Sequence, residues 1–111
     1  MGKRTEALSV SKKVRAAVNQ RQEYDGYPCC IIPTCGKPSR NLDMAHIIPR
    51  SHGGLGVEQN VVGLCRECHD LFDHGRPEER KEKRRQIDEY MNYKYGENWN
   101  PEDYRYKKVG Y

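Results

Sequence analysis

Two pairs of closely spaced cysteines constrain this chain more than any other feature of its sequence. Four residues separate Cys30 from Cys35, and two residues separate Cys65 from Cys68. Each short loop can present two thiolates to one ion, so together the pairs can form a tetrahedral zinc site. Hydrophobic residues make up only 35% of the 111 residues, which is a weak basis for a core of apolar side chains alone. The sequence therefore predicts a small domain stapled by zinc.

The cysteines leave alternatives open. Cys29 directly precedes Cys30 and could replace it as the first ligand, although four intervening residues fit the usual spacing of about two to four better. The run Cys65-x-x-Cys68-His69 is also a pattern of covalent haem attachment, which would need an oxidising compartment and would leave the other pair without a role. No signal peptide or membrane span is visible in the sequence. We therefore expect a cytoplasmic protein, because clustered cysteines in a reducing compartment more often bind metal.

Basic residues are abundant and unevenly distributed. Lysine and arginine total 20, the net charge is +4, and the stretch from Arg76 to Arg85 is especially basic. Such clustering favours a polyanionic partner such as nucleic acid. The interleaved Glu78, Glu79 and Glu82 fit a solvated helix face equally well. The charges alone do not decide between these interpretations.

Composition divides the chain into three segments. Residues 1–26 are predicted to form a helical arm, residues 27–75 contain all five cysteines and all four histidines, and residues 76–111 are predicted to form an amphipathic helix and a Tyr-rich tail. The arm is expected to be one helix up to about Tyr24, capped by Ser9 or Ser11.

The helix of the last segment is predicted from an apolar stripe. Ile87, Tyr90, Met91 and Tyr95 recur at helical spacing, and Gly96 follows them. A stripe of this kind packs against another part of the molecule. We expect the helix to start after Gly75, where a proline suits the first turn, and to stop at Gly96.

The middle segment reads as strand, loop, strand and helix. Residues 41–48 are predicted as a short strand closed by Pro49, and residues 51–56 as a glycine-rich loop. Residues 58–65 are predicted as a second strand, and a short helix follows from Cys68. The predicted class is a small α+β domain.

This segment also carries a resemblance to a known family. The run from Ala45 to Gly54, then Asn60, then the run from Leu64 to His69, resembles the HNH (His-Asn-His) nuclease family. It is most similar to the small, zinc-containing four-cysteine variants found in phages and prophages. The resemblance implies a ββα-metal module, which is a hairpin followed by a helix with a divalent ion between them. The zinc site would staple this module, and the two predicted terminal helices would flank it.

The resemblance also implies roles for individual residues. His46 would be the general base that deprotonates the attacking water, a task suited to an imidazole that titrates near neutrality. Asn60 would hold the loop that carries the base, and His69 would bind the catalytic ion. Asp73 stands where the family often has another histidine, and its carboxylate suits Mg²⁺ or Mn²⁺. His74 is a weaker candidate ligand.

One position departs from the family pattern. The residue before the base is commonly an Asp or His ligand of the ion, but here it is Ala45. Asp43 lies two positions earlier on the same face of the predicted strand and could supply the missing carboxylate. Arg50 and His52, beside the glycine-rich loop, are candidates for contact with DNA phosphate.

The leading functional hypothesis is a metal-dependent endonuclease that hydrolyses DNA phosphodiester bonds. The resemblance points to a phage or prophage protein in DNA processing or packaging, with a phage terminase as a possible partner and the host cytoplasm as its location. A non-catalytic zinc module that binds nucleic acid is the alternative. A zinc domain with a structural role in a protein assembly is a weaker third reading.

Overall fold

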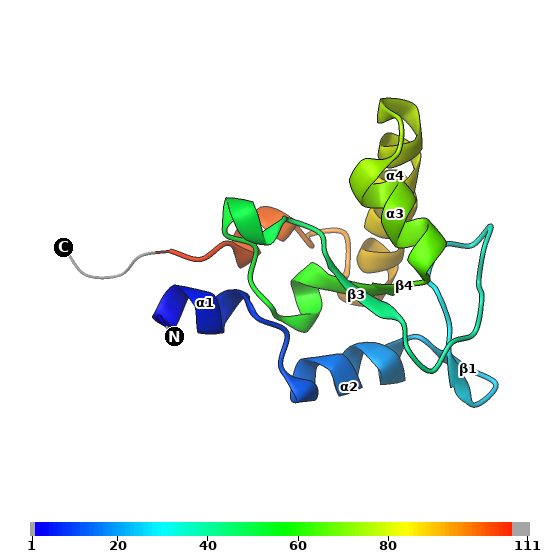
Figure 1. Ribbon diagram of the computed structural model, residues 1–111, viewed down its shortest axis with the longest axis horizontal. Coiled ribbons are helices and arrows are strands. Elements are labelled where there is room, and N and C mark those ends of the chain that lie inside the picture. Colours follow the sequence, from blue (N-terminus) through cyan, green and yellow to red (C-terminus); the bar gives the residue numbers. More distant parts are fainter. Residues whose placement is uncertain (1, 108–111) are drawn as a thin grey trace.

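A computed structural model describes residues 2–107 (Figure 1). The α-helices and strands are α1 (Lys3–Leu8), α2 (Lys12–Arg21), β1 (Glu23–Tyr24), β2 (Tyr27–Pro28), β3 (Asp43–His46), β4 (Val61–Leu64), α3 (Arg66–His74) and α4 (Pro77–Tyr95), and three short 3₁₀ helices are η1 (Arg50–His52), η2 (Glu58–Asn60) and η3 (Pro101–Tyr104). Helices flank two small antiparallel sheets, so the molecule has the predicted α+β class. The end of the predicted tail, Lys108 to Tyr111, lies outside the described residues.

The arm contains two helices: α2 is the predicted helix, capped by Ser11 and ending at Arg21 before the predicted Tyr24, and α1 was not predicted. Ser9 and Ser11 adopt extended backbone angles, and the Ser11 hydroxyl accepts a hydrogen bond from Val14 N at 3.1 Å. A serine that binds the backbone in this way starts a new helix and does not continue the preceding one. The break lets α1 turn back toward the rest of the molecule, where Leu8 is 3% exposed.

The central hairpin joins β3 to β4 in an antiparallel register that pairs Asp43 with Leu64 and His46 with Val61. Both strands are shorter than predicted. Residues 58–60 form η2 and not the start of a strand, because Asn60 N donates to Val57 O at 2.9 Å within the loop. The hairpin lies between α2 on one side and the α3–α4 pair on the other (Figure 1).

The outer edge of β4 is closed by side chains from the end of α2. The Gln22 amide accepts a hydrogen bond from Gly63 N at 2.8 Å and donates one to Gly63 O at 2.9 Å. Arg21 donates to Val61 O at 2.7 Å. Three of the backbone groups that a third strand would use are therefore already bonded: Gly63 N, Gly63 O and Val61 O.

Helix α4 packs through the predicted apolar stripe. Ile87 and Met91 are fully buried, and Tyr90 and Tyr95 pack against the same core. The helix starts with a proline in its first turn and is followed by Gly96, as predicted. No helix among residues 2–107 is long and apolar enough to cross a lipid bilayer.

Candidate active site and metal centre

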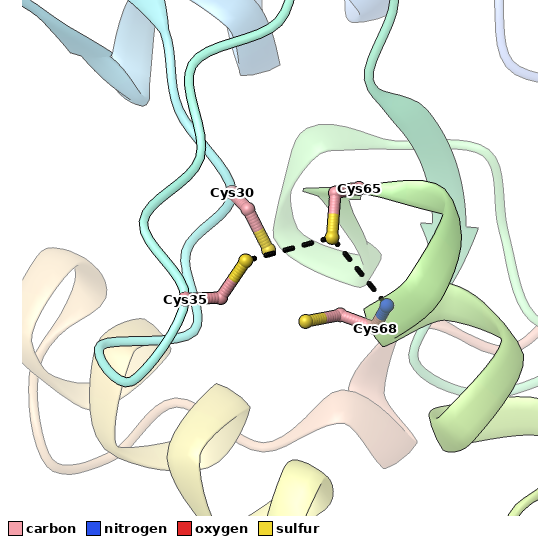
Figure 2. A group of neighbouring side chains, drawn as sticks. All are labelled: Cys30, Cys35, Cys65 and Cys68. Atoms are coloured by element: carbon pink, nitrogen blue, oxygen red, sulfur yellow. Dashed lines mark hydrogen bonds between the residues drawn. The ribbon is translucent and has the colours of Figure 1, made fainter.

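Four cysteines converge beside the start of α3. The sulfur atoms of Cys30, Cys35, Cys65 and Cys68 all lie within 4.8 Å of one another. Figure 2 shows two of them on the loop after β2 and two at the first turn of α3, all pointing inward. Cys29 is outside the group, with its sulfur 3.4 Å from Tyr27 O. This arrangement fits a structural metal ion such as zinc, with Cys30 as the first ligand.

Local geometry explains the convergence. Cys65 is the N-cap of α3, and its sulfur accepts a hydrogen bond from Cys68 N at 3.4 Å. On the opposite loop, Gly36 has φ of +60°, a left-handed conformation that glycine adopts without strain. The Cys35 and Cys65 sulfurs are 3.6 Å apart, which brings the two knuckles together.

Two of the four thiols, Cys30 and Cys68, have pKa values above the ordinary value, so the neutral form is favoured when no cation is bound. Burial raises the pKa of Cys30 to about 11, and burial followed by contact with Cys65 raises the pKa of Cys68 further. Burial also opposes ionisation of Cys65, but hydrogen bonds from Cys68 N and from neighbouring thiols outweigh it and lower its pKa. A bound metal replaces these protons, so metal binding and proton release are coupled here.

His46 ends strand β3 and is half-buried. Its Nε2 atom lies 2.7 Å from Leu8 O, and a carbonyl oxygen can only accept a hydrogen bond. The proton of the neutral ring is therefore on Nε2, and Nδ1 keeps its lone pair. Burial lowers the pKa of His46 below its ordinary value of 6.5, the Leu8 carbonyl raises it in part, and the positive charge of Arg50 lowers it.

Asn60 is fully buried behind the loop that follows His46. Its side-chain oxygen accepts from Ile48 N at 2.9 Å, while its amide nitrogen donates to Ile48 O at 3.2 Å and to Leu55 O at 2.9 Å. These three bonds join the two ends of the loop. Asn60 therefore holds the loop from within and does not line the cleft described below.

His69 lies on α3 between two carboxylates. Its Nδ1 atom is 3.0 Å from an Asp43 oxygen, and its Nε2 atom is 3.0 Å from an Asp73 oxygen. A neutral imidazole has one N–H, so only one of these contacts can be an ordinary hydrogen bond. The other requires a second proton or a cation beside the ring. Within residues 2–107, the four cysteines converge as a tight group of potential ligands, whereas these three side chains are more spread out.

His46 and the His69–Asp73 pair lie in the same cleft. It has a volume of about 1010 Å³ and is lined by His46, His69 and Asp73. Asp43 lies on the far side of the His69 ring and is not part of the lining. The exposed Arg50 and His52 of η1 line the cleft, as do cations from two helices: Arg15 of α2 and Arg80, Lys81 and Arg84 of α4.

Sequence reasoning missed two residues: Leu8, whose carbonyl oxygen contacts His46, and Arg15, which lines the cleft. Nothing in the sequence marked Leu8, because its contribution is a backbone oxygen. Arg15 was not distinguished from other basic residues of the arm. The basic residues of α4 could have been placed from the sequence. Residues on the helix face opposite the apolar stripe of Ile87 and Met91 cannot face the core and must lie on the surface.

Comparison with known proteins agrees with this geometry. The family of HNH endonucleases matches residues 30–86, just over half of the chain. A protein named Anaredoxin from Nostoc sp. (strain PCC 7120 / SAG 25.82 / UTEX 2576) is 31% identical over 61 residues, which cover 55% of this chain and 76% of that protein. No solved structure matches the chain. Together with the cysteine cluster and the strand, strand, helix order, the family match shows that the chain belongs to the HNH endonuclease family.

Proposed function

We propose that the protein is a metal-dependent endonuclease that hydrolyses DNA phosphodiester bonds, with His46 as the general base. The observation that carries the proposal is the common cleft of His46, His69 and Asp73. In this cleft the imidazole of His46, which has an available lone pair, faces the same space as His69 and Asp73, a histidine–carboxylate pair suited to a divalent cation. A base and a cation site in one cleft are the two parts that hydrolysis of a phosphodiester requires.

The residues divide the reaction between them. His46 Nδ1 accepts a proton from a water molecule as its oxygen bonds to phosphorus. One P–O ester bond then breaks, and the leaving oxygen is protonated from solvent. Burial favours the neutral form of His46, so the base is ready near neutral pH. A divalent ion, when bound, stabilises negative charge on the phosphoryl group and on the leaving oxygen.

The surroundings of His69 support a cation site with Nε2 and Asp73 as protein ligands. Asp43 accepts the Nδ1 proton, and this fixes Nε2 as the nitrogen with a lone pair. The Asp73 oxygen beside Nε2 then completes a pair that a cation satisfies. Asp43 as a direct ligand remains a prediction, but its contact with Nδ1 favours an orienting role.

The charge of the cleft supports a nucleic-acid substrate. Arg15 and Arg50 line the cleft together with Arg80, Lys81 and Arg84 of α4, so the cations come from three separate elements. Contacts from such side chains to phosphate provide affinity with little sequence readout. Arg50 and His52 remain our candidates for contact near the scissile phosphate.

We also propose the wider setting by resemblance. The protein would act on DNA during phage or prophage DNA processing or packaging in the host cytoplasm, with a terminase as a partner. In this scheme residues 27–75 are the nuclease module with its zinc knuckles. Residues 1–26 and 76–111 would be an arm and a helical tail that complete it.

Cleavage of supercoiled plasmid tests the enzymatic proposal. The protein stripped of weakly bound ions should nick DNA when Mg²⁺ or Mn²⁺ is added, and His46→Ala should reduce the rate by about 10²-fold or more. The variant should keep its zinc content and melting temperature, and added imidazole should restore part of the rate. Equal cleavage by the variant and the parent would refute His46 as the base.

A non-catalytic zinc module that binds nucleic acid is the second candidate. The observation that favours it is Ala45, which is 1% exposed and offers no ligand where the family commonly has one. This candidate predicts DNA binding that is unaffected by divalent ions and by His46→Ala, without cleavage under any metal.

A further inference from the structure

We propose that the N-terminal segment, residues 2–9, is part of the active site because the Leu8 carbonyl sets the tautomer and orientation of His46. This segment lies outside the part of the chain that matches the family. The inference rests on the proposed role of His46 as a base. It adds the element of the chain that gives His46 the tautomer and orientation that a base requires.

The contact between Leu8 and His46 is short and sheltered. The distance from Nε2 to the carbonyl oxygen is 2.7 Å, and Leu8 is 3% exposed. With this acceptor in place, the neutral ring must carry its proton on Nε2 and keep a lone pair on Nδ1. Without it, the ring could adopt either tautomer and could rotate, because within residues 2–107 this is the one hydrogen bond of the His46 ring.

Further contacts hold the segment against the loop after β3. Gly56 N donates to Ala7 O at 2.9 Å. The Arg50 side chain reaches Ser9 Oγ at 3.4 Å, and Arg4 reaches Arg50 O at 3.5 Å. The segment therefore binds the same loop that Asn60 holds from within. The position of the base depends on both sides of this loop.

Gly56 makes this docking possible. A Cβ atom at Gly56 would lie 2.1 Å from Ser9 O and 2.5 Å from Ser9 C, which is far inside van der Waals contact. Gly56 does not have a positive φ, so alanine is compatible with its own backbone. A methyl group there would act mainly by pushing the segment away. The clash is with backbone atoms, which cannot rotate out of reach.

The test compares Gly56→Ala with Gly2→Ala in the zinc-loaded protein. Gly2 belongs to the same segment, and a Cβ there meets no atom within 4 Å. The ¹⁵N chemical shifts of the histidine rings report which nitrogen is protonated. We expect the parent and Gly2→Ala to show His46 protonated on Nε2, and Gly56→Ala to lose this preference. Zinc content should be unchanged in all three.

Cleavage kinetics provide the second readout. Gly56→Ala should lower kcat by about tenfold or more, a part of what general base catalysis contributes, and should change KM by less than about twofold. If Gly56→Ala fails to fold, Leu8→Ala takes its place, since it removes the buried anchor of the segment and should shift the tautomer in the same direction. The proposal is overturned if the variant that folds keeps the parent's His46 ¹⁵N shifts, whatever its rate. Because these shifts need no substrate, a parent that does not cleave DNA would refute the proposed function and leave this test intact.

Discussion

The two candidate metal sites are adjacent in the chain, at Cys68 and His69, yet they are built differently. The cysteine cluster has four like ligands, three of which are buried, and their sulfurs lie within 4.8 Å of one another. The histidine site has one imidazole between two carboxylates, one of which, Asp73, is exposed, and it opens onto a large cleft. The cysteine cluster would enclose an ion, whereas the histidine site would leave coordination positions open to the cleft.

This difference suits the cysteine cluster to a structural ion and the histidine site to an ion that can also bind water and substrate. A closed tetrahedral set of thiolates has no position for substrate, whereas a site with few protein ligands keeps positions for water and phosphate. Helix α3 links the two sites, since its N-cap and first turn carry two of the cysteines. A metal in the cluster therefore fixes the helix that presents His69.

The largest effect is expected from breaking the cysteine cluster. Cys65→Ser keeps a good N-cap for α3 but removes a zinc ligand. Binding of structural zinc is worth about 10–16 kcal/mol in small zinc peptides, comparable to the whole stability of a domain, about 5–15 kcal/mol. We expect zinc loss and the disappearance of a cooperative thermal transition, measured by metal analysis and circular dichroism.

Cys29→Ser is the matched control, because Cys29 is a neighbouring cysteine outside the cluster. It should retain zinc and melt like the parent protein. Zinc loss in this variant, with retention in Cys65→Ser, would mean that the ligand set is assigned wrongly.

A smaller effect is expected at the histidine site. Asp73→Asn removes the carboxylate charge beside His69 Nε2 and should weaken Mn²⁺ binding by about tenfold or more, which is about 1.4 kcal/mol per factor of ten. Asp70→Asn makes the same charge change on α3 at an exposed position outside the cleft. Calorimetric titration of Mn²⁺ into the zinc-loaded proteins measures both. Equal affinities for the two variants would exclude Asp73 as a ligand.

The same contrast explains what the sequence could predict. The cysteine pairs are local patterns whose spacing alone favours a zinc site, and the cluster contains the four residues predicted. The approach of Asp43 to His69 depends on how the hairpin packs on α3, so the sequence indicated the residue but not which side of the ring it contacts. The hydrogen bond from His46 to Leu8 joins residues 38 positions apart through a backbone oxygen, which any residue type could supply. Contacts of this kind leave no trace in composition or spacing.

The affinity of the cleft for DNA should also depend on salt concentration, because basic side chains line it. Lys81 lines the cleft, whereas Lys83 on the same helix does not. If Lys81 contacts a phosphate, Lys81→Ala should reduce the slope of log affinity against log salt by about 0.9. Lys83→Ala should change the slope much less. Fluorescence anisotropy with a short duplex over a range of salt concentrations measures both, and identical slopes would place DNA elsewhere.

The smallest effect is a displacement of the pH profile. The active form of His46 is neutral and exists above its pKa, which burial lowers from 6.5. The cleavage rate should therefore fall on acidification with a midpoint below 6.5, measured with saturating Mg²⁺ at each pH. A midpoint above 6.5 would contradict the assignment. Charged and titratable groups that share the cleft with His46 also act on this profile: Arg15, Arg50, His52, His69, Asp73, Arg80, Lys81 and Arg84.

The side chains that close the edge of β4 have a consequence for strand pairing between molecules. A two-stranded sheet normally offers an unpaired edge that can recruit a strand from another molecule and begin aggregation. Here the Gln22 amide occupies both backbone groups of Gly63, so a glutamine side chain takes the place of a neighbouring strand. A strand from another molecule could therefore pair with β4 at Gly63 only after the Gln22 side chain had left.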